Sequence, residues 1–352
     1  MIIYGHPLHD DVLVDKVSSR TGESMETGKD VDITLPESLL SSAVVIAGPA
    51  SRDLALEISS SMGLEINYPE LRIFSDGESK IRIIENLKYK TCIVVQSICP
   101  PHVDRNIIQT LMMLKKCIDD STKDIIVVVP YMAYARQDRA FLFGEVVTIE
   151  LLAKLYQTLG ARHIVTVDIH SLRALSYFEK RMHSINVSAI PLLADYAKSK
   201  LGTNMNNSIT VSPDEGGIDR AQFLARLINN DVICMKKLRD KHTGEVFTDY
   251  ASSNERIRAR GRDVVLIDDI ISTGNTISKT AQILKSDGCR DIIAMCTHAL
   301  LTAESSERIK AAGVSKIVTT NSIPKAAGID SFVEVISLGP ILAPPISKIL
   351  LT

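Results

Sequence analysis

The chain has 352 residues, which is long enough for two ordinary domains. Hydrophobic residues make up 45% of it and charged residues 23%, close to the average of soluble globular proteins. A formal net charge of −2 leaves no basic surface for bulk nucleic-acid binding, and no apolar run reaches membrane-spanning length. The N-terminus lacks the basic start and long apolar core of a signal peptide. The composition therefore predicts a cytoplasmic protein that binds neither nucleic acid nor a membrane.

Residues 1–41 differ from the rest of the chain because they are polar, rich in Ser, Thr, Gly and Asp, and only weakly periodic. A segment of this kind can bury little apolar surface, which favours a flexible extension over an ordered structural arm. The sequence of this extension points to no function.

From residue 42 onward, short apolar runs alternate with amphipathic stretches such as AQFLARLINN. The runs cover residues 42–48, 91–97, 124–131, 163–169, 208–212, 231–236, 263–269, 291–300 and 316–322. This alternation predicts an α/β fold in which mostly parallel sheets carry helices on both faces. The strands are too many for one compact sheet, and a second group starts near residue 188. We therefore expect two similar domains, residues 42–187 and 188–352.

Several common motifs are absent. The six cysteines, at positions 92, 99, 117, 234, 289 and 296, include no CxxC pair, so they read as buried free thiols and not as a zinc site. Neither GxxxxGK[ST] nor GxGxxG occurs, so any nucleotide chemistry is not of the P-loop type.

The first polar segment of interest is RIFSDGESKIRI, residues 72–83, in which a turn containing Asp76, Gly77 and Glu78 separates two alternating strands. By itself this pattern indicates a simple hairpin. The second segment, PYMAYARQDR, follows an apolar strand and carries Arg136 and Arg139, whose guanidinium groups suit polyphosphate or carboxylate. A solvated surface loop with internal ion pairs would explain that composition equally well.

Two further segments follow strands and so should reach the same edge of a sheet. His170 stands just after the run HIVTVDI, and Asp214 follows SITVS and precedes a Gly pair. In an open α/β sheet, the crevice at the carboxyl ends of the strands is where ligands bind. Together His170 and Asp214 are suited to hold Mg²⁺, which takes few protein ligands and keeps waters and phosphates.

The segment KKLRDKHTGEV, residues 236–246, is basic and polar, and we expect it to form a mobile loop. A solvated hairpin tip is the simpler interpretation of an isolated charge cluster. A mobile loop with Lys and Arg can instead close on a reacting phosphate and stabilise its charge.

The strongest signal is VVLIDDIISTGNTI, residues 264–277. Val264–Ile267 predict a buried parallel strand, so that Asp268 and Asp269 would follow its carboxyl end. Ser272–Thr276 would form a small-residue turn before a helix, which offers backbone N–H groups and a positive dipole to a phosphate. Two adjacent acids beside it cannot face that phosphate, but they can face sugar hydroxyls or a metal. The stretch therefore predicts a phosphosugar site.

Taken together, these motifs resemble those of the ribose-phosphate pyrophosphokinases, the synthetases of phosphoribosyl pyrophosphate. The stretches FSDGE, YARQDR, VDIH, SPDEGG and DDIISTGNT occur in the family's order and at its spacing, over roughly residues 43–345. The resemblance implies two phosphoribosyltransferase-like domains. It also implies transfer of the pyrophosphoryl group of ATP to the C1 hydroxyl of ribose 5-phosphate, with AMP leaving.

The resemblance also implies roles for individual residues. The 5-phosphate would be held by Ser272, Thr273, Gly274, Asn275 and Thr276, and the ribose hydroxyls would face Asp268 and Asp269. ATP would be bound by Arg136 and Gln137 and, from a neighbouring subunit of a homo-oligomer, by Phe74, Asp76, Gly77 and Glu78. Mg²⁺ would be held by His170 and Asp214, and the catalytic pair would be Lys237 and Arg239, the latter also contacting ribose 5-phosphate.

The chain departs from the family pattern at two places. Ser272 stands where many members carry Asp, although a Ser hydroxyl can still bind phosphate. Gly144 and Glu145 replace a more basic stretch and look more like archaeal members. Two alternatives remain open: a phosphoribosyltransferase, which would share DDIISTGNT but have a single such domain, and a non-catalytic synthetase-like regulatory subunit.

Overall fold

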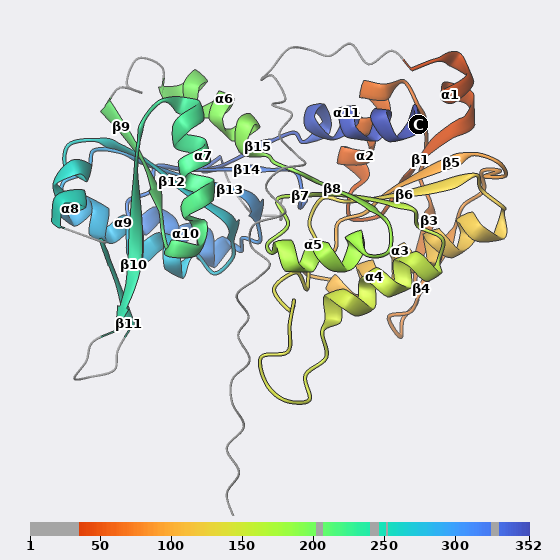
Figure 1. The fold of residues 1–352 in the computed structure, drawn as a ribbon, viewed down its shortest axis with the longest axis horizontal. Helices are drawn as coiled ribbons and strands as arrows, with labels where there is room; N and C mark the ends of the chain where they lie inside the picture. The colour runs from red at the N-terminus through yellow and green to blue at the C-terminus, as the bar shows by residue number, and fades with distance from the viewer. Residues whose placement is uncertain (1–34, 202–206, 240–245, 251–252, 325–330) are drawn as a thin grey trace, which may run out of the picture. The chain divides into compact units, whose positions relative to one another are not determined.

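The computed structural model describes residues 35–201, 207–239, 246–250, 253–324 and 331–352. Within them the chain forms two large, mostly parallel sheets flanked by helices, together with a small two-stranded hairpin (Figure 1). The predicted α/β fold class is therefore confirmed. Among the described residues, no helix combines the length and the apolarity needed to cross a bilayer.

The first sheet has six strands in the order β2-β1-β5-β6-β7-β8, all of them parallel. They are β1 (Ala43–Ala47), β2 (Glu65–Asn67), β5 (Thr91–Val95), β6 (Asp124–Val129), β7 (His163–Val167) and β8 (His183–Val187). The central strands are apolar on both faces because helices cover both, as parallel sheets require. The hairpin of β3 (Glu70–Ile73) and β4 (Ser79–Arg82) lies between β2 and β5 in the sequence.

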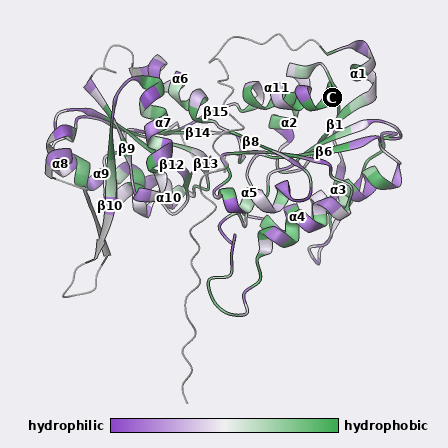
Figure 2. Ribbon diagram, in the orientation of Figure 1, coloured by the Kyte–Doolittle hydropathy of each residue, from purple (hydrophilic) through white to green (hydrophobic). Residues whose placement is uncertain are grey.

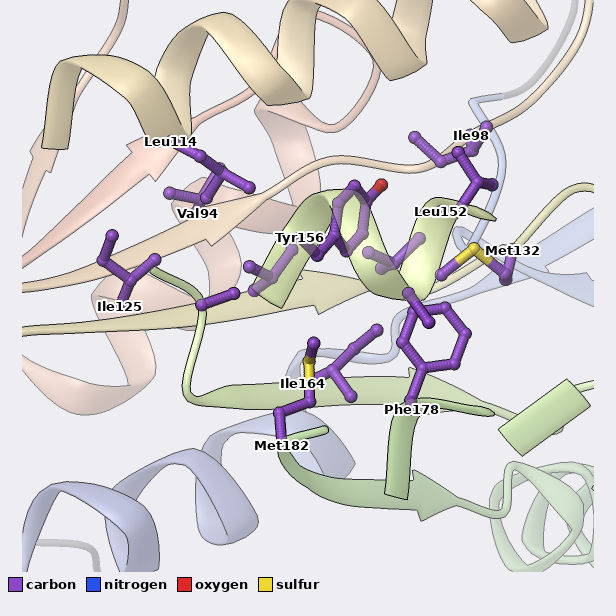
Figure 3. Close-up of a cluster of buried hydrophobic side chains, with 14 of the residues drawn as sticks. Val94, Ile98, Leu114, Ile125, Met132, Leu152, Tyr156, Ile164, Phe178 and Met182 are labelled. Carbon is purple, nitrogen blue, oxygen red and sulfur yellow. The ribbon is translucent and has the colours of Figure 1, made fainter. Parts of the chain in front are cut away.

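Helices pack on both faces of the first sheet. One face is covered by α3 (Val103–Asp119), α4 (Thr148–Thr158) and α5 (Leu172–Glu179), and the other by α1 (Glu37–Ser42), α2 (Arg52–Met62) and α11 (Gly339–Leu350). On the first face, Tyr156 and Phe178 are fully buried with ring centroids 6.3 Å apart (Figure 3).

The second sheet has seven strands in the order β11-β10-β9-β12-β13-β14-β15. They are β9 (Ser208–Ser212), β10 (Asp231–Arg239), β11 (Val246–Tyr250), β12 (Asp263–Ile271), β13 (Ile292–Ala299), β14 (Lys316–Thr320) and β15 (Val333–Ile336). All neighbours are parallel except β10 and β11, which form an antiparallel hairpin.

Helices also cover both faces of the second sheet. One face packs against α6 (Ile190–Leu201) and α7 (Ile218–Ile228), and the other against α8 (Ser253–Ala259), α9 (Asn275–Ser286) and α10 (Ala303–Ala311). Figure 2 shows hydrophobic colour along the strands and mixed colour on the helices, as expected for helices with one buried face. It also shows the loop between β6 and α4 largely in hydrophobic colour, and Phe141, Leu142, Phe143 and Val146 there are exposed.

All nine apolar runs form strands, but two sequence expectations about their ends are wrong. Asp268 and Asp269 do not follow the strand, since β12 continues through Ile271 and pairs with β13 as far as Ala299. Residues 236–239 do not begin a loop, since β10 extends to Arg239 and pairs with β11. Main-chain hydrogen bonding to a neighbouring strand therefore outweighs the polar side chains at both places.

The two ends of the chain also bear on the domain boundaries. Residues 1–34 of the predicted extension lie outside the described residues, whereas Glu37–Ser42 form α1. At the other end, α11 packs against α2, and its Leu342 and Ile346 are buried with residues of the first sheet. The last helix of the chain thus completes the layer on the first sheet, which the sequence boundary at residue 188 did not anticipate.

Polar side chains join the two sheets. Thr297 Oγ1 of β13 donates a hydrogen bond to Asp168 Oδ2, just after β7, at 2.6 Å. His298 Nε2 lies 3.1 Å from the carbonyl oxygen of Val167, and its Nδ1 lies 2.9 Å from Ser322 Oγ. His298 is fully buried, so these groups satisfy each other away from water.

Candidate functional site

A cavity of about 500 Å³ collects most of the motifs singled out in the sequence. It is lined by Arg136, His170, Asp214 with Gly216 and Gly217, Arg220, and the run Asp268–Ile277. These residues belong to the carboxyl end of β12 and to the segments that follow β6, β7, β9 and β12. The cavity therefore lies where strand ends of open α/β sheets bind ligands.

The two acids occupy the part of β12 that extends beyond its neighbour β9. The β9–β12 pairing ends at Leu266, whereas β13 pairs with β12 to Ile271. Asp268 and Asp269 therefore have β-structure on one side only, and their side chains line the cavity. Their side chains are 20% and 6% exposed, so both carboxyls are largely removed from bulk water.

The small-residue turn after β12 leads directly into α9. Gly274 has φ 76° and is the residue before the first turn of the helix, a conformation that glycine adopts without strain. A Cβ at Gly274 would come within 2.8 Å of Ile309 on α10, so close packing also requires glycine. The free N–H groups at the start of α9 then border the cavity, which suits a phosphate.

Arg308 of α10 is not among the cavity-lining residues, but it donates hydrogen bonds to this turn. Its Nη1 donates to the carbonyl oxygen of Thr273 at 3.1 Å and to Asn275 Oδ1 at 2.7 Å. Its Nη2 donates to Glu304 at 2.6 Å. The guanidinium group thus holds the residues on either side of Gly274 and places a positive charge beside the turn.

The two acids have different partners. Asp269 Oδ2 lies 2.6 Å from His170 Nδ1 and 3.6 Å from Arg220, and Asp268 Oδ1 lies 3.6 Å from Arg220. Burial raises the pKa of Asp268 to about 7, together with the hydrogen bond and the negative charge of Asp269. Burial also acts to raise the pKa of Asp269, but His170 and Arg220 outweigh it and hold that pKa below its usual range. Asp269 is therefore the ionised member of the pair.

His170 and Asp214 both line the cavity, as their positions after strands suggested. When His170 donates from Nδ1 to Asp269, its Nε2 keeps a lone pair for a metal, an arrangement typical of metal-ligating histidines. Within the described part of the chain, no group of three or more His, Cys, Asp or Glu side chains forms a complete metal cage. This donor set fits Mg²⁺, which binds through one or two protein ligands plus substrate phosphates and waters.

The loop that carries Arg136 and Gln137 is held by several side-chain hydrogen bonds. Tyr134, at φ 65°, donates to Asp104 of α3 at 2.6 Å, and Gln137 Oε1 accepts from Thr148 at 2.8 Å. Asp138 Oδ2 accepts from Ser171 at 2.5 Å, which ties the loop to the residue after His170. Arg136 lines the cavity, whereas Gln137 is exposed outside its lining.

Some predicted residues do not line the cavity. Phe74, Asp76, Gly77 and Glu78 lie on the turn of the β3–β4 hairpin, as the sequence predicted for that turn, and the last three are exposed. Lys237 and Arg239 lie on β10, opposite Thr248 and Val246 of β11, and their side chains are outside the described residues.

Arg220 and Arg308 are not among the site residues that the sequence predicted. Arg220 follows the Gly pair of SPDEGG in the first turn of α7, and its nearness to that motif was the available signal. Arg308 gave no signal, because it meets the Ser272–Thr276 turn only through tertiary packing, 33 residues after Asn275.

Comparison with known proteins gives matches over nearly the whole described chain. Residues 43–160 match the family described as the N-terminal domain of ribose phosphate pyrophosphokinase, and residues 186–331 match the phosphoribosyl transferase domain family. The chain is 33% identical over 306 residues to a ribose-phosphate pyrophosphokinase of Helicobacter pylori, covering 87% of this chain and 92% of that protein. It is 32% identical to that of Sulfurisphaera tokodaii, covering 85% and 99%.

A solved structure gives the same match in three dimensions. The crystal structure of phosphoribosylpyrophosphate synthetase from Mycobacterium smegmatis superimposes with a TM-score of 0.78 at 26% identity. The superposition covers 87% of this chain and 98% of that one, so both sheets and their helices correspond.

Proposed function

This chain belongs to the ribose-phosphate pyrophosphokinase family, and we propose that its reaction takes place in the cavity lined by residues 268–277. The protein transfers the pyrophosphoryl group of ATP to the C1 hydroxyl of ribose 5-phosphate. The products are 5-phosphoribosyl 1-pyrophosphate, which serves nucleotide biosynthesis, and AMP. A phosphoribosyltransferase, the alternative with one such domain, would have no counterpart of the matched N-terminal domain.

The ribose 5-phosphate site is the turn Ser272–Thr276 together with Asp268 and Asp269. The observation that carries this assignment is that the start of α9 and the two acids border the same cavity. The N–H groups of the turn would bind the 5-phosphate, since a helix N-terminus favours an anion. The carboxylates, which lie near the end of β12 just before this turn, would accept hydrogen bonds from the ribose hydroxyls.

ATP is bound from two sides in this proposal. Arg136 would contact its phosphates from the cavity wall, and Gln137 would lie beside it on the same loop. Phe74, Asp76 and Glu78 would reach the adenine and ribose from a neighbouring subunit, because their own hairpin turn is outside this cavity lining. The proposal therefore requires a homo-oligomer, dimer or higher, with a shared ATP site. We also propose that the protein is cytoplasmic.

Mg²⁺ would be held by His170 and Asp214 and by the phosphate oxygens of ATP. When bound, it would neutralise charge on the phosphates and orient them for an in-line displacement. The contribution of this chain is the geometry of the ligands. Asp269 fixes the ring of His170 through the 2.6 Å contact with Nδ1 and so directs Nε2 away from β12.

Positioning and charge stabilisation carry the reaction, because phosphoryl-type transfer leaves little covalent work to the protein. The C1 hydroxyl must attack the β-phosphorus roughly in line with the leaving oxygen. Lys237 and Arg239 on the β10–β11 hairpin would neutralise charge that develops on the transferred group, and Arg239 would also contact ribose 5-phosphate. A single contributor of this kind lowers the barrier by about 3–4 kcal/mol.

The decisive experiment mixes the purified protein with ATP, Mg²⁺ and ribose 5-phosphate and identifies the nucleotide product. AMP that forms only when ribose 5-phosphate is present supports the proposed site chemistry, whereas ADP would contradict it. Absence of turnover with ribose 5-phosphate still bound would favour the regulatory-subunit alternative. Lys237→Ala should lower turnover far more than it weakens ribose 5-phosphate binding, and normal turnover would remove Lys237 from the mechanism.

A further inference from the structure

Arg220 stands in the first turn of α7, on a different element from the two acids that it faces. Its Nη1 lies 3.6 Å from Asp268 Oδ1 and its Nη2 lies 3.6 Å from Asp269 Oδ2. The side chain is 19% exposed and lines the cavity. One guanidinium group thus faces both carboxylates at once, and its planar fork suits two acceptors.

The acids need such a partner. Two neighbouring carboxyls on one strand repel each other, and burial makes an unpaired charge costly. His170 contacts Asp269, while the N–H of Asp269 donates to Asp268 Oδ1 at 2.8 Å. Among the described residues, Arg220 is the only arginine or lysine that forms an ion pair with Asp268 or Asp269.

The position of Arg220 is not explained by the stability of α7 itself. A cation in the first turn lies at the positive end of the helix dipole, which disfavours it. A Cβ at Gly217 would come within 2.7 Å of Ser212 Oγ, so glycine allows the start of α7 to pack closely against the end of β9. The positive charge of Arg220 is therefore unfavourable for α7 itself, but it is favourable for the two buried acids that it faces.

We propose that Arg220 is a positioning residue for ribose 5-phosphate, fixing the carboxylates of Asp268 and Asp269 in the orientation in which they border the cavity. Hydroxyl groups donate well to a carboxylate in a fixed orientation, and poorly to one that is rotated away. Without Arg220 the sugar loses acceptors of fixed orientation, whereas the ATP contacts proposed for Arg136 and Gln137 remain. The proposal rests on the assignment of these two acids to the ribose hydroxyls.

The test compares Arg220→Met and Arg220→Lys with Arg226→Met, a change of an exposed arginine on the same helix. Steady-state kinetics give KM for each substrate, and calorimetry on the full chain gives the affinity for ribose 5-phosphate. Arg220→Met should raise KM for ribose 5-phosphate about tenfold or more, the equivalent of about 1.4 kcal/mol. KM for ATP should stay within about twofold, and Arg220→Lys should recover part of the loss.

Two results would overturn the proposal. Unchanged KM for ribose 5-phosphate in both Arg220 variants is one, and equal rises in both KM values with a lowered melting temperature is the other, since that pattern indicates general loss of structure. Asp269→Asn, measured in parallel, distinguishes a failure of the role proposed for Arg220 from a failure of the assignment of the two acids to the ribose hydroxyls. If Asp269→Asn binds ribose 5-phosphate normally, the assignment fails and the role of Arg220 with it. If Asp269→Asn binds weakly and Arg220→Met binds normally, only the role of Arg220 fails.

Discussion

His170 and Asp269 are 99 residues apart in the sequence, yet the Nδ1 atom of one lies 2.6 Å from the Oδ2 atom of the other. His170 follows a strand of the first sheet, and Asp269 belongs to a strand of the second. The contact therefore joins the proposed metal ligand of one half of the chain to the proposed ribose-binding strand of the other. Any change at one of these residues should be felt at both sites.

The first prediction concerns Asp269→Asn. Loss of the carboxylate should leave the His170 ring less firmly oriented. Mutation of a hydrogen-bond partner of a metal-ligating histidine typically lowers metal affinity by about 10- to 100-fold. A titration of activity with Mg²⁺ at saturating ribose 5-phosphate should show a half-maximal concentration raised by about that factor. Asp195→Asn, an exposed acid on α6, is the control and should titrate like the wild type. An unchanged Mg²⁺ requirement in Asp269→Asn would separate the contact from metal binding.

The second prediction concerns Arg308, which braces the turn before α9 through Thr273 and Asn275. Arg308→Gln should loosen the turn and remove a positive charge near the 5-phosphate. Two hydrogen bonds from a charged group are lost, so KM for ribose 5-phosphate should rise by roughly tenfold with little change in KM for ATP. Glu307→Gln, also exposed on α10, should leave both values unchanged. A larger effect on ATP than on ribose 5-phosphate would show that Arg308 acts elsewhere.

The third prediction concerns Gly274→Ala. The residue has φ 76°, and a Cβ there would meet Ile309 at 2.8 Å, so both strain and overlap oppose the change. Denaturant unfolding should show a loss of about 1–3 kcal/mol, and ribose 5-phosphate binding should weaken. Adding Ile309→Val should relieve the overlap but not the backbone strain, so only part of the loss should return. Full recovery in the double variant would mean that the positive φ costs nothing here.

The fourth prediction concerns the pH dependence of stability. Burial lowers the pKa of His298 and outweighs the opposing charges of Asp168 and Asp269. The unfolded chain therefore binds a proton at a pH where the folded chain does not, and stability is lost as pH falls through about 6.5. His163 is shifted in the same direction, again chiefly by burial. The free energy of unfolding should fall between about pH 7.5 and 5.5, by at most about 1.4 kcal/mol per pH unit for each histidine.

His298→Asn is the variant that tests this assignment. The substitution removes the titrating group, so the variant should unfold with a shallower pH dependence over the same range, even if its stability at pH 7.5 is lower. Urea unfolding curves at several pH values provide the measurement. A slope equal to that of the wild type would mean that His298 does not contribute.

The sequence by itself determined the fold class and the order of the strands along the chain. Apolar runs such as TCIVV and DIIVVV form strands because helices on both faces make continuous burial favourable, and that pattern is local. The turn Ser272–Gly274 could also be predicted from the sequence, since a run of small residues before a helix is typical of a tight turn. What the sequence did not give was the end of β12, because pairing with β13 as far as Ala299 is decided by a neighbour 28 residues or so further along.

Only the tertiary structure decided which charged groups meet. Arg220 and Arg308 carry no distinguishing pattern, because a single Arg in a helix is usually a solvated one, and each reaches its partners only once α7 and α10 have packed on the second sheet. The packing of α11 against the first sheet likewise cannot be predicted from its sequence, since an apolar helix face does not specify which surface it packs against. Local composition sets which elements form, whereas contacts between elements distant in the chain depend on packing and set the electrostatics of the cavity.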